Sequence, residues 1–174
     1  MKTKILIVSL VILSCGFSQT MLGVELGKKF AGAPEGFEEV QKGFCTGGKF
    51  AGQSVTAFAY MTNTEGVVIS TFIISREGNF NELLRIYNTY KDAISSKYSN
   101  HVPDVVRRAQ RGYEFGDGYE LQGIKLGHLE LATRWFDVNG INIGLTFNAT
   151  DYTKGTIILV YTIPQDDIDI SDDF

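Results

Sequence analysis

The sequence predicts an α+β fold, in which a mainly antiparallel sheet of about six or seven strands carries two helices packed on it. Several short runs rich in β-branched and aromatic residues are bounded by glycine and other turn formers, as in hairpins and meanders. One longer segment carries apolar residues three and four positions apart, the spacing of an amphipathic helix. Prolines are few, so most of the expected turns are marked by glycine.

The N-terminal half is expected to begin with an edge strand and a short helix. Leu22, Val24 and Leu26 alternate with other residues, which favours a strand. Residues 34–42 follow with a proline at the first position, where helices tolerate it best. Gly43 then supplies the residue that commonly ends a helix. We therefore expect a helix over residues 34–42 that depends on tertiary packing because it is short.

A hairpin and a long helix come next. Residues 50–62 and 67–75 are rich in aromatic and β-branched residues and flank turn-forming residues, which predicts two paired strands. A helix is predicted over residues 80–98, because Asn79 can cap it and Glu82 lies three positions further on. The predicted core stripe of this helix is Leu83, Tyr87, Tyr90, Ile94 and Tyr98.

The C-terminal half is predicted to be a meander of four strands. Their ranges are 120–126, 129–138, 141–147 and 156–163. Asn139 and Gly140 separate the second strand from the third, and both residues accept the positive φ of a type I′ turn. Together with the preceding elements, these strands are expected to form one α+β domain over residues 19–165. Residues 166–174 contain five aspartates and predict an acidic disordered tail.

The first 18 residues have the layout of a secretory signal peptide, which predicts export to the periplasm or the extracellular space. Lys2 and Lys4 form a positive segment, and residues 5–13 are apolar apart from Ser9. This run is about half the roughly 20 apolar residues that a transmembrane helix needs. We therefore interpret it as a removable leader.

Two cleavage positions remain open. Small residues at Gly16 and Ser18 favour cleavage before Gln19, which would release a lipid-free protein. Alternatively, residues 12–15 resemble a bacterial lipobox, in which Cys15 is lipidated and anchors the protein to a membrane. Leu13 at the second position before the cysteine fits that pattern poorly, so the lipid-free product is the preferred hypothesis.

Composition excludes several classes of protein. The formal net charge is −4 at pH 7, and removing Lys2 and Lys4 would make the protein more acidic, so no nucleic-acid partner is expected. The cluster of Arg107, Arg108 and Arg111 is interpreted as a solvated face. Only two cysteines are present, and one lies in the leader, so a disulfide scaffold is excluded.

Short segments of the chain resemble small exported proteins of gut Bacteroidota. These segments are Gly43-Phe44, Lys49-Phe50-Ala51-Gly52, Lys97-Tyr98 and Gly116-Asp117-Gly118-Tyr119-Glu120-Leu121-Gln122. The resemblance covers most of residues 22–163, but the turn after Tyr98 differs, because its proline is delayed to Pro103. The family has no assigned activity, so the resemblance implies fold and compartment, and no catalytic residues.

No catalytic, cofactor or metal motif is complete. Residues 43–50 have the glycine and lysine spacing of a P-loop but end in Phe50, which has no hydroxyl for Mg²⁺. His101 and His128 with Cys45 lack the spacing of a zinc site. The same three residues leave a small secreted thiol hydrolase as a minor hypothesis. We therefore assign no catalytic residue, cofactor or metal, and favour a binding protein over an enzyme.

Two binding hypotheses follow. In the first, the polar face of the meander or an unpaired sheet edge docks a protein of the cell envelope or the extracellular space. In the second, an aromatic platform binds a glycan or another small ligand. The candidate residues of the platform are Tyr113, Phe115, Tyr119 and Trp135, with Arg134 or Asn142 as hydrogen-bonding partners. The opposing interpretation of Trp135 is that it fills the core.

Overall fold

The structure is a computed structural model, and it describes residues 20–110 and 112–164. The predicted signal peptide with Cys15, the predicted acidic tail and Arg111 lie outside the described residues. Within the described ranges, no helix is both long enough and apolar enough to cross a membrane.

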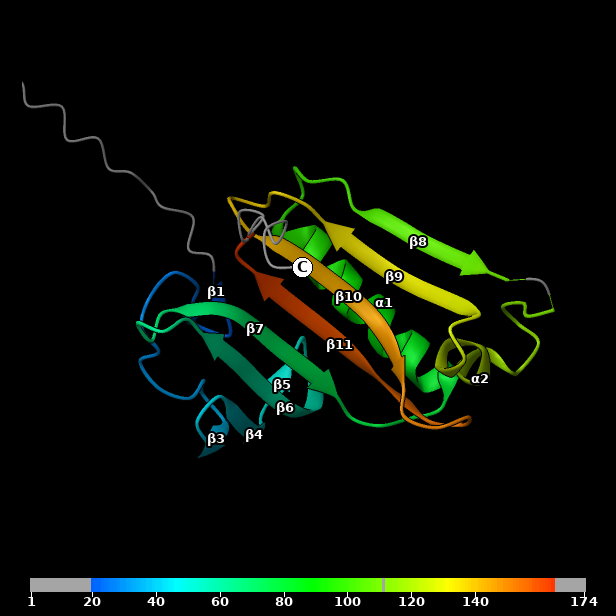
Figure 1. Cartoon of the computed structure of the whole chain (residues 1–174), viewed down its shortest axis with the longest axis horizontal. Helices are drawn as coiled ribbons and strands as arrows, with labels where there is room; N and C mark the ends of the chain where they lie inside the picture. The colour runs from blue at the N-terminus through cyan, green and yellow to red at the C-terminus, as the bar shows by residue number, and fades with distance from the viewer. Residues whose placement is uncertain (1–19, 111, 165–174) are drawn as a thin grey trace, which may run out of the picture.

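Nine strands of the described chain form one antiparallel sheet (Figure 1). Eight of them follow the spatial order β3 (Phe37–Gln41), β4 (Phe44–Gly47), β6 (Gln53–Thr62), β7 (Val68–Ser75), β11 (Gly155–Thr162), β10 (Asn142–Ala149), β9 (Leu129–Trp135) and β8 (Asp104–Ala109). The ninth strand, β5 (Lys49–Phe50), pairs with β6 beside this order. The remaining elements are a small sheet of β1 (Thr20–Met21) and β2 (Val24–Glu25), and the helices α1 (Phe80–Lys97) and α2 (Glu120–Lys125).

The predicted fold class is therefore wrong. We expected an α+β protein with six or seven strands and two packed helices, whereas the described residues form eleven strands in two sheets. In the part of the chain that the structure describes, only α1 is a long helix, and α2 has six residues. The chain is mainly β, with a large antiparallel sheet on which α1 lies (Figure 1).

The helix predicted over residues 34–42 is a strand. Residues 37–41 form β3, which pairs with β4 through the turn at Lys42 and Gly43. Gly43 has a φ of 86°, so its conformational freedom serves a hairpin turn where we expected a helix end. The aromatic ring of Phe37 lies over Gly48 and contacts Phe58, which holds the hairpin on the core. Ladder pairing and this contact outweigh the weak helix propensity of a short segment.

The segment before β9 contains one wrong prediction and one strand that was not predicted. Residues 120–126 were predicted as a strand, but residues 120–125 form α2. The Asp117 side chain accepts the backbone N–H of Tyr119 at 2.8 Å, which favours a turn leading into a helix. Residues 104–109 were not predicted as a strand and form β8, on which Arg107 and Arg108 are exposed, as expected of a solvated face.

Other elements match their predictions closely. Asn79 and Glu82 form the expected reciprocal capping box at the start of α1. Asn139 and Gly140 have φ values of 55° and 82°, as a type I′ turn requires. The predicted hairpin is present as β6 and β7, although a turn at Ala51 and Gly52 divides the first predicted strand.

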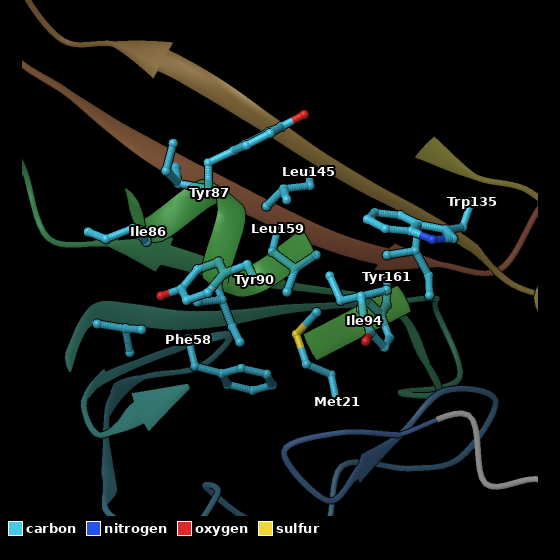
Figure 2. Close-up of a cluster of buried hydrophobic side chains, with 14 of the residues drawn as sticks. Met21, Phe58, Ile86, Tyr87, Tyr90, Ile94, Trp135, Leu145, Leu159 and Tyr161 are labelled. Carbon is cyan, nitrogen blue, oxygen red and sulfur yellow. The ribbon is translucent and has the colours of Figure 1, made fainter. Parts of the chain in front are cut away.

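The core lies between α1 and the sheet (Figure 2). Leu83, Tyr87, Tyr90 and Ile94 are the buried stripe of α1, as predicted. Phe50 meets Tyr90 edge-on at a ring-centroid distance of 4.8 Å, and Phe147 meets Tyr87 at 5.1 Å. Strands on both sides of the sheet's centre therefore contact one helix.

Replacing Tyr90 by Phe should make the protein more resistant to alkali. Burial raises the pKa of Tyr90 to about 12, and no residue of the described chain hydrogen-bonds its hydroxyl. The tyrosine pKa is about 10 in the unfolded chain and higher in the folded protein, so the folded protein holds the phenol proton more tightly. The free energy of unfolding is therefore unaffected below about pH 10 and decreases as the pH rises from there toward the folded pKa. Urea unfolding between pH 7 and 11 should show a shallower alkaline loss for Tyr90→Phe. A loss of more than about 2 kcal/mol at pH 7 would contradict this interpretation.

Candidate functional site

The six residues of the predicted aromatic platform are divided among separate places in the fold. Trp135 is fully buried on the face of β9 that meets α1 (Figure 2). Its directly paired neighbour Ile143 is also buried. The structure thus places Trp135 in the core and away from any surface platform.

The other aromatic residues lie in the segment between β8 and α2. Tyr113 stacks on His128 with ring centroids 4.6 Å apart. The ring of Phe115 lies 4.5 Å from the guanidinium carbon of Arg107, a cation–π contact. Tyr119 is 63% exposed. These three rings face different neighbours, and only Phe115 lines a hollow described below.

The two polar candidates serve local structure. Arg134 donates to Glu130 at 2.9 Å, and Arg108 lies 3.6 Å from the same carboxylate. The side-chain oxygen of Asn142 accepts the backbone N–H of Asp137 at 3.0 Å, which supports the turn between β9 and β10. Neither side chain is arranged around Trp135 to receive a ligand.

The residues of a thiol hydrolase are not brought together. Cys45 on β4 is fully buried, and burial together with the nearby Glu39 raises the pKa of its thiol. The neutral thiol is a poor nucleophile. Four strands separate β4 from β9, and His128, which bonds Gln110, directly precedes β9. No group of three or more potential metal-ligating side chains occurs in the part of the chain that the structure describes.

The best-formed candidate site is built around β8. This strand ends the sheet, and no described strand pairs with its outer edge (Figure 1). Its six residues pair with β9 in continuous register, from Asp104 opposite Arg134 to Ala109 opposite Leu129. The site therefore starts from a straight, regular edge strand.

The orientation of the backbone of β8 follows from one hydrogen bond. The N–H of Gln110 donates to the carbonyl of His128 at 2.8 Å, so position 110 bonds toward β9. Hydrogen-bonded and non-hydrogen-bonded pairs alternate along an antiparallel ladder. Asp104, Val106 and Arg108 therefore bond inward, and the N–H and C=O groups of the alternate residues point outward. These outward residues are Val105, Arg107 and Ala109.

A groove of about 400 Å³ lies beside this edge, on the α1 face of the sheet. Leu84, Asn88 and Lys91 follow one another along α1 and form its helical wall. Val105 and Arg107 of β8 face them, because each is paired with a β9 residue on the α1 side. The remaining lining residues are Phe80, Asn81, Tyr87, Phe115, Gly116, Glu120 and Leu131.

The end of the groove is held by hydrogen bonds within the 113–120 segment. The buried carboxylate of Glu120 accepts the backbone N–H of Gly116 at 2.8 Å. Asp117 accepts the backbone N–H groups of Glu114 and Tyr119. A second hollow of about 380 Å³ continues past Phe80, Gly116 and Glu120 toward Tyr152. The wall that carries Phe115 is thus fixed by its own side chains.

The groove combines apolar walls with positive charge. Val105 is 53% exposed, although it is a large apolar residue. Arg107 and Lys91 have no ion-pair partner within the described residues, whereas Arg108 and Arg134 share Glu130. Glu120 is the one carboxylate in the lining, and it is buried and bonded to the N–H of Gly116. An apolar surface with two cations that form no ion pair favours an occupant that carries apolar and acidic side chains.

Comparisons with known proteins add no further information on this site. No protein-family model, curated protein or solved structure matches the chain. The resemblance to small exported proteins of gut Bacteroidota therefore stays a prediction.

Replacing Trp135 by Ala should cost about 3–5 kcal/mol of unfolding free energy, because it empties a fully enclosed site in the core. Urea unfolding measures this loss. Phe136 follows Trp135 in the chain, and its side chain is 58% exposed. Phe136→Ala is therefore the control and should change the unfolding free energy by less than about 1 kcal/mol. A Trp135→Ala protein with unchanged stability would return Trp135 to the surface and to the ligand hypothesis.

Proposed function

We propose that this chain is an exported, non-enzymatic protein-docking module, whose docking surface is the free edge of β8 together with the adjoining groove. The occupant is an extended segment of a protein, which adds to the sheet as a further strand. The observation that carries the proposal is the outward row of unpaired backbone groups at Val105 and Arg107, placed directly beside a groove of about 400 Å³.

Strand addition uses both parts of this surface. Backbone hydrogen bonds to an exposed edge supply affinity, and pockets for alternate side chains supply specificity. Side chains of an added strand alternate between the two faces of the sheet. Every second side chain of the occupant would therefore point toward the groove lined by Leu84, Lys91 and Phe115.

The opposite edge of the sheet is less suited to docking. β3 has a bulge between Glu39 and Gln41 in its pairing with β4, which disrupts the regular spacing of backbone groups. β8 pairs without a bulge along its whole length. Bulges are a common means by which proteins protect an edge strand, so the irregular β3 is protected where β8 is not.

The charges of the site indicate the kind of segment that fits. Apolar residues are favoured opposite Val105 and Val106, and acidic residues opposite Arg107 and Arg108. Asp104 at the beginning of the strand favours a basic residue. The alternative functions have less support, because the aromatic platform is dispersed and Cys45 is buried on β4, four strands away from the β9 end beside His128.

A synthetic peptide of sequence Thr-Glu-Glu-Val-Val-Lys should bind this edge, because it places these side chains opposite β8 in antiparallel orientation. Arg107→Pro removes one outward N–H without breaking a bond to β9, so it should abolish binding. Arg107→Ala is the matched control, because it removes the same side chain and keeps the N–H. Fluorescence anisotropy gives the affinities, and amide chemical-shift changes locate the peptide.

The docking proposal requires a clear difference between the two variants. Binding weakened by Arg107→Ala and lost in Arg107→Pro supports strand addition. Equal binding by both variants, shift changes away from β8 and α1, or no binding at about 1 mM peptide would contradict it.

A further inference from the structure

We propose that the segment that docks on β8 is β8 of a second copy of this chain, in one two-fold antiparallel register that places Val106 opposite Val106. This inference rests on the proposed function, since it names the partner of the same edge. The feature that carries it is the self-complementary sequence of the strand, in which Asp104 precedes Arg108 by four residues.

The backbone restricts the possible registers. A new ladder needs residues with outward N–H and C=O groups opposite one another, and these residues are Val105, Arg107 and Ala109. A symmetric pair can therefore place Val105 opposite Val105, Val105 opposite Arg107, or Arg107 opposite Arg107. All other symmetric registers shift the overlap toward the ends of the strand.

Side-chain charges select one of these three registers. Pairing Val105 with Val105 places Asp104 opposite Val106 and Arg108 opposite Val102, so neither charge meets an opposite one. Pairing Arg107 with Arg107 places like charges directly opposite each other, which is destabilising. Pairing Val105 with Arg107 instead places Asp104 opposite Arg108 at both ends of the overlap. Val106 then lies at the centre, opposite its own copy.

The second copy also completes the groove. Residues opposite each other share a face of the sheet, so Arg107 of the second copy lies beside Val105 on the α1 side. The exposed apolar surface of Val105 is then covered by the aliphatic part of that side chain. Both α1 helices lie on the same face of the combined sheet, because the two-fold axis runs perpendicular to it. The two grooves thus become neighbours across the joint.

Charged residues on an edge usually oppose association with another strand. In this register, each Arg108 meets an Asp104 of the other copy, and the two Arg107 residues are offset by two positions along the strands. The acidic net charge, −4 for the full sequence and more negative without Lys2 and Lys4, repels the two copies only weakly, because surface charges are screened over about 8 Å at physiological ionic strength. The Asp104–Arg108 pairs at the two ends of the overlap offset part of this repulsion, whereas Arg107 meets Val105 and gains no acidic partner across the joint.

A cysteine at the central position tests the register directly. Central residues of a non-hydrogen-bonded pair have Cα atoms about 4.5 Å apart, within the range that a disulfide spans. Val106→Cys should give a covalent dimer on mild oxidation. Val105→Cys is the control, because its copy lies two positions away along the strand, beyond the roughly 7 Å limit for a disulfide. Cys45 is buried and present in both variants.

Charge reversal provides a second, non-covalent test by sedimentation velocity. Asp104→Arg or Arg108→Asp alone should weaken the dimer by about tenfold or more, because each places like charges opposite one another at both ends. The double variant should restore the affinity of the dimer, because an arginine at position 104 then faces an aspartate at position 108 of the other copy. Within each copy, Asp104→Arg faces Arg134 and Arg108→Asp faces Glu130, so both changes also weaken the pairing of β8 with β9. The double variant carries both of these losses, so they cannot explain a recovery of the dimer.

The outcomes separate this inference from the proposed function. Preferential cross-linking of Val106→Cys with recovery in the double variant supports self-pairing. Equal or absent cross-linking, or a monomeric wild-type chain at about 100 μM, overturns self-pairing. If the synthetic peptide still binds in that case, β8 remains a docking edge for another protein; if it does not, both proposals fall.

Discussion

The packing of α1 on the centre of the sheet is the constraint on which the rest of the structure depends. Tyr87, Tyr90 and Ile94 bury one helix against β10, β11 and their neighbours. A helix with its side chains is about 10–12 Å wide, and strands lie about 4.8 Å apart, so one helix covers little more than two strands. The nine-stranded sheet is far wider, and β8 must extend beyond the helix (Figure 1). The groove between α1 and β8 is the direct result.

This arrangement separates stability from binding. Trp135 and the other buried aromatic residues lie under the sheet beside α1, where their removal would unfold the protein. Val105 and Arg107 lie at the margin, where few contacts hold them and an added strand could cover them. The 113–120 segment connects the two regions, because Glu120 is buried while its partner Gly116 lines the groove. A docking surface is thereby fixed in place without taking residues from the core.

The sequence predicted the locally determined elements and missed those that depend on pairing. The helix α1 and the turn at Asn139 and Gly140 were found because capping and turn residues act over a few positions. β3 was missed because Pro34 and Gly43 resemble the start and end of a helix, and β8 because its charged residues resemble a solvated segment. Only pairing with β4 and β9 makes them strands. Of the candidate site, only Phe115 was among the predicted residues, although an unpaired sheet edge was expected to dock a protein. The adjacent valines of β8, after Pro103, were the one available signal.

The central claim is that β8 offers a free edge with an alternating backbone pattern, and amide hydrogen exchange followed by NMR tests it most directly. In dilute protein, the amides of Val106 and Arg108 should be protected by β9, while those of Val105 and Arg107 exchange rapidly. At high protein concentration, the two rapid amides should become protected as the edge is occupied. Uniformly rapid exchange along β8, or protection of Val105 and Arg107 that does not depend on concentration or added peptide, would contradict the account.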